Sequence, residues 1–179
     1  MSVREDIAAV KRRDPAARSS FEIWLLYSGM HGVWGYRFAH WLWTHRAKFL
    51  GRFVSQVTRF LTGVEIHPGA TIGRRLTIDH GMGIVIGETA EVGDDVHLYH
   101  GVTLGNAKSQ PGKRHPTLGD RITVGAGAKI FGPVTVGDDT VVGGNAVVTK
   151  SFPAGSVLVG VPAKDVRKKA PDQTDLYSI

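Results

Sequence analysis

The amino-acid sequence predicts a mainly β protein, namely a parallel β-helix preceded by an α-helical segment. Three observations support this fold class. Aliphatic side chains recur every six residues after residue 63. Glycine accounts for 23 of the 179 residues, nearly twice the usual ~7%, which indicates many tight turns. All four tryptophans lie before residue 62, among apolar residues spaced by threes, fours and sevens.

Residues 1–62 are predicted to form the helical segment. Arg4 to Arg13 is a short polar helix that the Asp14-Pro15 pair ends. Residues 21–27 and 32–61 have the spacing of amphipathic helices. We expect these helices to pack on the core or on each other, and the weaker alternative is a helix that lies on a membrane surface.

Residues 63–165 are predicted to form the β-helix. Every sixth residue is Ala, Val, Ile or Leu at thirteen positions, although these four types make up only 57 of 179 residues. A period of six fits neither an α-helix nor a hairpin array, but it fits a short strand with a turn, three to a coil, in coils stacked ~4.8 Å apart. The thirteen positions are Ile66, Ile72, Ile78, Ile84, Ala90, Val96, Val102, Leu118, Val124, Ile130, Val136, Val142 and Val148.

Two segments interrupt or end the repeat. The separation of Val102 from Leu118 is not a multiple of six, so the polar segment 105–117 is predicted to leave the coil as a loop. A long loop on a rigid scaffold is usually functional. Residues 166–179 are predicted to be a flexible C-terminal tail.

The composition excludes several classes of protein. The chain has no cysteine, which excludes a disulfide scaffold and a thiolate nucleophile or metal site. It has no uninterrupted apolar run long enough to cross a bilayer and no secretory h-region, so we expect a cytoplasmic protein with no membrane span. The net charge of +6 comes from scattered residues without a recognition motif, so we expect no nucleic-acid partner.

The candidate catalytic groups are imidazoles and carboxylates. Asp79 and His80 follow an inward isoleucine, so at least one of the two side chains faces outward. Glu65 lies nearly one coil earlier in the sequence, where its carboxylate could approach His80 and orient the ring as a base. Arg114 and His115 lie in the predicted loop, where they can reach a neighbouring surface.

These residues lie in motifs that resemble the serine O-acetyltransferase family of the hexapeptide-repeat acyltransferases. The motifs are IDHGMGIVIGET, KRHPTLGD and GVPAK, and upstream RRDPAA and HGVWGYRFAHWLW, so the resemblance covers residues from about 10 to 165. It implies a left-handed β-helix, a homotrimer with active sites between adjacent chains, and no metal. The implied reaction transfers the acetyl group of acetyl-CoA to L-serine and gives O-acetyl-L-serine, the first step of cysteine biosynthesis.

The resemblance also implies roles for individual residues. His80 would be the general base for direct attack by the serine hydroxyl, Glu65 its partner, and His115 a further catalytic residue. Asp14 and Asp79 would bind the serine ammonium group, and Arg114 with His115 its carboxylate. The residues implied in CoA binding are Gly105, Ala126, Gly144 and Lys164.

The sequence departs from the family pattern at three places. Glu65 stands where the family often has Asp, and Asn106 breaks a glycine pair after TLG. The chain begins close to the RRDP motif, without the long helical region that pairs trimers in many relatives, so we expect a trimer rather than a hexamer. The C-terminal Ile179 resembles the residue with which relatives dock into O-acetylserine sulfhydrylase, so that enzyme is an expected partner.

Three other functions stay open at this point. One is an O-acetyltransferase for a sugar or related hydroxyl, although such an acceptor has no need of two carboxylates and a guanidinium. Another is a zinc enzyme that uses His80, His97 and His100, but His97 and His100 are three apart on a strand and would point to opposite faces. The last is a non-catalytic assembly platform, in which the loop with Arg114 would have no purpose.

Overall fold

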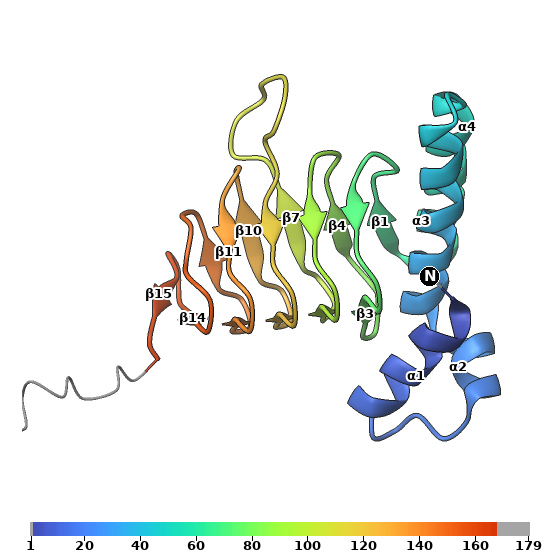
Figure 1. Cartoon of the computed structure of the whole chain (residues 1–179), viewed down its shortest axis with the longest axis horizontal. Coiled ribbons are helices and arrows are strands. Elements are labelled where there is room, and N and C mark those ends of the chain that lie inside the picture. The colour runs from blue at the N-terminus through green and yellow to red at the C-terminus, as the bar shows by residue number, and fades with distance from the viewer. Residues whose placement is uncertain (1, 168–179) are drawn as a thin grey trace, which may run out of the picture.

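The computed structural model describes residues 2–167, in which four helices stand at one end of a stack of β coils (Figure 1). The helices are α1 (Val3–Arg13), α2 (Ser20–Leu26), α3 (Ser28–Thr44) and α4 (Lys48–Thr62). Helix α1 begins with a capping box between Ser2 and Glu5, which satisfies two backbone donors at its start. Gly63 ends α4 in the left-handed conformation with φ 71°, and the first strand follows directly.

The predicted helical stretch 32–61 is two helices rather than one. The chain turns at residues 45–47, where Arg46 has φ 67°, and α3 and α4 then pack against each other. Gly51 permits this close approach, because a Cβ there would lie 2.9 Å from the carbonyl oxygen of Ala39. No glycine or proline marks the turn, so the break has no signal in the residue types.

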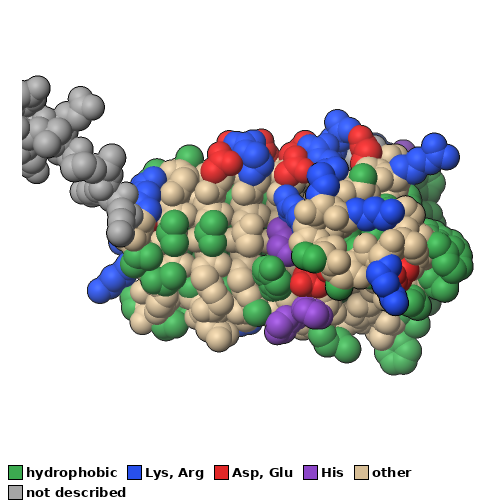
Figure 2. Space-filling view, turned by 90° about the horizontal axis from the view of Figure 1, so that it is seen from below, with side chains coloured by type: hydrophobic (Ala, Val, Ile, Leu, Met, Phe, Trp, Pro, Cys, Tyr) green, Lys and Arg blue, Asp and Glu red, His purple; other side chains and the backbone are tan. Residues whose placement is uncertain are grey.

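The helices bury only part of their apolar surface. Met30, Val33 and Tyr36 of α3 pack in the core, as expected. However, Trp24 and Trp41 are about half exposed, and Phe60 is almost fully exposed. Hydrophobic side chains are therefore visible at the helical end in Figure 2. No helix within residues 2–167 is both long enough and apolar enough to cross a bilayer.

The coils form three sheets, which confirms the predicted parallel β-helix. The first sheet contains β1 (Val64–Ile66), β4 (Ile84–Ile86), β7 (Thr103–Gly105), β10 (Lys129–Phe131) and β13 (Val147–Val148). The second contains β2 (Thr71–Ile72), β5 (Glu91–Val92), β8 (Thr117–Leu118) and β11 (Thr135–Val136). The third contains β3 (Thr77–Ile78), β6 (His97–Leu98), β9 (Thr123–Val124), β12 (Val141–Val142), β14 (Val157–Val159) and β15 (Lys164–Asp165). All the named pairs are parallel except β14 with β15.

Three corners join these sheets, and each corner recurs from coil to coil. The first corner lies between the first and second sheets and includes residues 67–70 and 87–90. The second corner lies between the second and third sheets and includes residues 93–96 and 119–122. The third corner returns the chain to the first sheet and includes residues 79–83 and 99–102. The predicted loop leaves the coil at the first corner and projects from it (Figure 1).

All thirteen predicted positions are buried, with exposed fractions of at most 6%. The single six-residue count from 66 to 102 is nevertheless wrong about register. Val64 pairs with Ile84 and Ile66 with Ile86, so the first coil is two residues longer than three repeats of six. The six-residue count still falls on buried positions, because residues two apart on a strand face the same side. In this coil Ile84, which the count predicts, and Ile86, which pairs with Ile66, are both buried.

The two extra residues lie in the third corner of the first coil. Ile78 and Ile84 are six residues apart there, whereas Leu98 and Val102 are four apart in the next coil. The longer turn contains His80, Gly81 and Gly83, with φ values of 61°, 75° and 75°. The first coil thus has a wider corner than its neighbours, and His80 lies on it.

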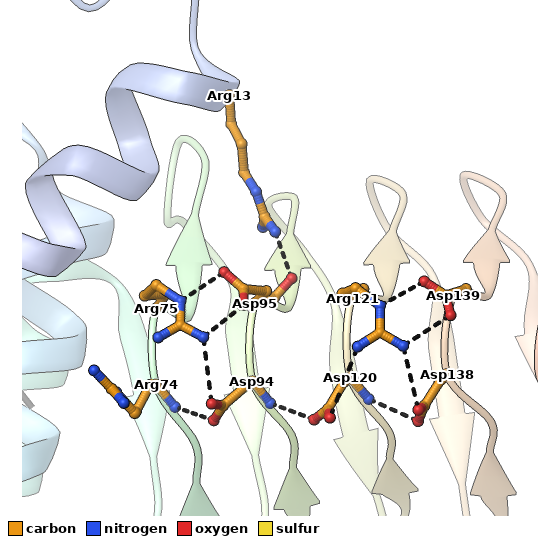
Figure 3. Close-up of polar contacts among 9 residues, drawn as sticks. All are labelled: Arg13, Arg74, Arg75, Asp94, Asp95, Asp120, Arg121, Asp138 and Asp139. Atoms are coloured by element: carbon orange, nitrogen blue, oxygen red, sulfur yellow. Dashed lines mark hydrogen bonds and ion pairs between the residues drawn. The ribbon is translucent and has the colours of Figure 1, made fainter.

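Polar side chains bind one coil to the next along the second corner (Figure 3). Asp94 accepts the backbone N–H of Arg74 at 2.7 Å, and Asp120 accepts that of Asp94 at 2.7 Å. The Arg75 guanidinium binds Asp95 and lowers the pKa of its carboxyl group. These repeated bonds fix the spacing of the coils at this edge.

The same corner anchors α1. Arg13, the last residue of α1, donates hydrogen bonds to the carbonyl oxygen of Asp95 and, at 2.9 Å, to Oγ1 of Thr77. Near the other end of α1, the buried Asp6 binds Arg37 and accepts the Trp34 indole N–H at 3.0 Å. The position of Asp14, the residue that follows α1, is therefore fixed relative to the coil.

Candidate active site

A cleft of about 380 Å³ lies where the helical segment meets the third corner of the first coil. Figure 2 shows histidine side chains gathered in the lower middle of the face drawn, with a small acidic patch beside them. The lining residues come from the turn after α1, the junction of α2 with α3, and the wide corner. They are Asp14, Ala16, Leu26, Tyr27, Ser28, Gly29, Ile78, Asp79 and His80.

His80 and Asp79 form the coil side of this cleft. The His80 side chain is 70% exposed, and its Nε2 lies 3.6 Å from Oδ2 of Asp79. The Asp79 backbone continues the strand ladder, since its N–H donates to the carbonyl of Leu98 at 2.9 Å. The imidazole is therefore presented to solvent by a rigid edge, with a carboxylate beside it.

Asp14 forms the helical side of the cleft. Its Oδ1 accepts the backbone N–H of Ala16 at 2.7 Å, and its Oδ2 accepts the Tyr27 hydroxyl at 2.6 Å. Asp14 and Asp79 thus line the same cleft, although they are far apart in the sequence. Two carboxylates around one opening are suited to binding a cationic group.

Glu65, the expected partner of His80, forms an ion pair with another side chain in the structure. Glu65 lies in β1, and its Oε2 is 3.3 Å from Nε of Arg59 at the end of α4. The ionic partner that the structure gives His80 is Asp79.

Arg114 and His115 lie at the first corner, where Thr89 holds them. Thr89 Oγ1 accepts the backbone N–H groups of Arg114 and His115 at 3.0 and 3.1 Å. The Thr89 N–H donates to Nδ1 of His115 at 3.1 Å, which leaves the proton of a neutral ring on Nε2. The Arg114 guanidinium binds Glu88, and this bond lowers the pKa of the Glu88 carboxyl group.

His115 is almost completely buried, with 7% of its surface exposed. Burial and the nearby Arg114 lower the pKa of its imidazole. The ring fits only because residue 87 is glycine, since a Cβ there would lie 2.1 Å from Nε2 of His115. The motif Gly87-Glu88-Thr89 therefore supports Arg114 and His115. Sequence reasoning missed this function because the contacting residues are more than a full coil apart in the chain.

One chain keeps the two groups of candidate residues apart. His80, Asp79 and Asp14 surround the third corner, whereas Arg114 and His115 belong to the first. These corners lie at opposite ends of the strands of the first sheet. Within one chain, the two groups therefore line different edges of the coil.

Two of the four residues implied in CoA binding share the corner of His80. Ala126 and Gly144 lie in successive coils of the third corner, where Asn145 N–H donates to the carbonyl of Ala126 at 2.8 Å. Gly105 instead ends β7 towards the first corner, where a Cβ would lie 2.8 Å from the Phe131 ring. Lys164 lies in β15 and is exposed at the far end of the coil.

The histidines of the zinc alternative do not converge. The rings of His80 and His100 are 5.6 Å apart between centroids, but Nδ1 of His97 is hydrogen-bonded to Oγ1 of Thr77 at 2.7 Å. Burial and the nearby Arg13 lower the pKa of the His97 imidazole. Within residues 2–167, no three His, Cys, Asp or Glu side chains form a group that could hold a metal ion.

The chain is similar to known serine acetyltransferases. It is 55% identical to the serine acetyltransferase of Mycobacterium tuberculosis over 170 residues, which are 95% of this chain and 74% of that protein. No protein-family model matches the chain.

The chain is also similar to solved structures of serine acetyltransferases. The crystal structure of Neisseria gonorrhoeae serine acetyltransferase in complex with serine matches 92% of this chain and 67% of that chain, with a TM-score of 0.88 and 37% identity. The Brucella abortus serine acetyltransferase in complex with coenzyme A matches 94% of this chain and 67% of that chain, with a TM-score of 0.91 and 38% identity.

Proposed function

Because the chain belongs to the serine acetyltransferase family, we propose that the cleft at the third corner is the serine-binding half of its active site. The protein is an acyltransferase that moves the acetyl group of acetyl-CoA to the hydroxyl of L-serine and gives O-acetyl-L-serine. This reaction is the first step of cysteine biosynthesis. The main support for this site is that Asp14, Asp79 and His80 line the same cleft.

His80 is the general base of the proposed mechanism. Its exposed ring takes the proton of the serine hydroxyl, and the oxygen attacks the thioester carbonyl without an acyl-enzyme. The C–S bond then breaks, and the sulfur takes up the proton that His80 holds. Asp79 Oδ2 lies 3.6 Å from Nε2 of His80, so this carboxylate borders the reacting group as well as the ammonium site.

Charge complementarity determines the proposed binding of serine. Asp14 and Asp79 bind the ammonium group in the cleft, and Arg114 binds the carboxylate with a planar fork of donors. His115 contributes its Nε2 donor to the same carboxylate. Glu65 is the proposed partner that orients the His80 ring, and its Oε2 also lies 3.3 Å from Nε of Arg59.

We propose a homotrimer, because the two halves of the site lie at different corners of one chain. In a ring of three chains, the first corner of one chain can meet the third corner of the next, so that each interface completes one site. The loop that carries Arg114 projects from the first corner and is suited to reach across such an interface (Figure 1).

The third corner is the proposed path of the pantetheine arm. His80, His100, Ala126 and Gly144 follow one another along this corner, so three spacings of ~4.8 Å give a track about 14 Å long. Backbone groups of Ala126 and Gly144 line the track, and Gly105 would contribute from the neighbouring chain. Lys164 lies further along the coil, where its charge could meet a CoA phosphate.

The activity is tested by following release of the CoA thiol from acetyl-CoA with L-serine, L-homoserine and a sugar offered in parallel. We expect rapid release with L-serine and little with the sugar. Faster release with the sugar would support the alternative hydroxyl acceptor and would contradict the proposed roles of Asp14 and Arg114.

O-Acetylserine sulfhydrylase is a proposed partner through Ile179, which lies outside the described residues. Deleting Ile179 is expected to abolish binding to the sulfhydrylase and to leave serine acetylation unchanged, since the isoleucine side chain is lost and the terminal carboxylate moves back to Ser178. Calorimetric titration of the sulfhydrylase with both chains measures this effect. Equal affinity for the two chains would refute the interaction.

A cytoplasmic location is part of the same proposal, because acetyl-CoA is made and used inside cells.

A further inference from the structure

Tyr27 lies at the junction of α2 and α3 with its backbone held by both helices. Its N–H donates to the carbonyl of Ile23 at 3.3 Å and so ends α2. Its own carbonyl accepts the N–H groups of Met30 and His31 at 3.0 and 3.1 Å and so begins α3. The side chain therefore enters the cleft from a fixed backbone position.

The Tyr27 hydroxyl completes the fixation of Asp14. It donates to Oδ2 at 2.6 Å, while the backbone N–H of Ala16 donates to Oδ1 at 2.7 Å. With one donor on each oxygen, the carboxylate cannot rotate freely about its C–C bond. Each oxygen still has acceptor capacity for a ligand in the cleft.

The surroundings of Tyr27 keep its hydroxyl a donor. Burial, the bond to Asp14, and the nearby carboxylates of Glu22 and Asp79 raise the pKa of Tyr27 to about 12. A phenol with this pKa stays protonated at neutral pH. A hydrogen bond from such a donor to an ionised carboxylate is of the stronger, charge-assisted type.

We infer that Tyr27 is a positioning residue for serine, because its hydroxyl aims the Asp14 carboxylate at the substrate ammonium group. The inference rests on the proposed role of Asp14. Tyr27 itself touches neither the serine hydroxyl nor the thioester in the proposed site. Its loss therefore weakens the binding of serine and leaves the chemical step largely intact.

The substitution Tyr27→Phe removes the hydroxyl and keeps the ring. We expect the KM for L-serine to rise about tenfold, since the variant loses a hydrogen bond to a charged group. The kcat and the KM for acetyl-CoA are expected to stay within about twofold of the wild-type values. Steady-state thiol release with each substrate varied in turn measures all three constants.

Tyr36→Phe is the matched control. Tyr36 is also in the helical segment, is buried, and donates from its hydroxyl to the carbonyl of Ala70 at 2.6 Å, away from the cleft. This variant is expected to lower the melting temperature without changing the KM for L-serine. If both variants raise that KM equally, the effect of Tyr27 is a general loss of stability and the inference is wrong.

A double variant tests whether Tyr27 acts through Asp14. Asp14→Asn is expected to raise the KM for L-serine, and adding Tyr27→Phe should raise it no further, because the oriented carboxylate is already lost. Independent, multiplicative effects would overturn the inference and leave the role of Asp14 intact. If Asp14→Asn leaves the KM unchanged, the proposed role of Asp14 itself fails.

Discussion

The substitution His80→Ala is expected to lower kcat at least about 10²-fold, because it removes the group that takes the proton of the serine hydroxyl. The fold should survive, since the His80 side chain is 70% exposed and lies on a turn. Thiol release at saturating L-serine and acetyl-CoA measures kcat, and a melting curve checks the fold.

His80→Asn is the matched control for backbone strain. His80 has φ 61°, a conformation that Asn adopts more readily than Ala. Both variants should lose activity equally if the imidazole is the cause. An active His80→Asn variant, or an unchanged His80→Ala variant, would contradict the role of His80 as the base.

The second large effect is expected for Arg114→Ala. In the proposed site, the Arg114 guanidinium pairs with the serine carboxylate, so its loss should lower kcat/KM for L-serine about 10- to 100-fold. Arg114→Lys should recover only part of this, because Lys keeps the charge but lacks the planar fork of donors. Thiol release over a range of L-serine concentrations measures both variants.

Ethanolamine separates carboxylate binding from other effects of Arg114. It has the hydroxyl and the ammonium group of serine but no carboxylate, so Arg114→Ala should leave its slow acetylation unchanged. The contrary result is that Arg114→Ala lowers the acetylation of ethanolamine by the same factor as that of L-serine. In that case Arg114 does not act through the substrate carboxylate. The loss of activity would then come from the broken ion pair with Glu88, which holds the end of the loop in place.

Much of the fold could be predicted from the sequence because a β-helix is periodic. Each coil buries aliphatic residues at nearly regular intervals, so the repeat and the loop were visible in the residue types alone. The handedness of the coil could not be predicted from the spacing, because a six-residue period fits either hand and parallel crossovers are usually right-handed. The register shift at residues 79–83 was also hidden, because a shift of two returns the same face to the core.

The site could be predicted only where residue type alone was informative. The Asp79-His80 and Arg114-His115 pairs stood out as polar residues beside an aliphatic pattern. Their separation at two corners was not visible in the residue types, because it depends on which sheet each neighbouring strand joins and on where the loop leaves the coil. Tyr27 was missed because its contact with Asp14 crosses a helix and has no periodic signal.

In the proposed trimer, each active site combines His80 of one chain with Arg114 of its neighbour, and mixing two inactive variants shows whether the site is shared. His80→Ala and Arg114→Ala chains are unfolded together in equal amounts, refolded, and assayed for acetylation of L-serine, with native mass spectrometry to verify mixed oligomers. Recovery to about one quarter of wild-type activity is expected, because about one in four interfaces in a random ring joins an intact His80 to an intact Arg114. Mixed oligomers no more active than either variant alone would show that both residues serve the same chain or that they share no site.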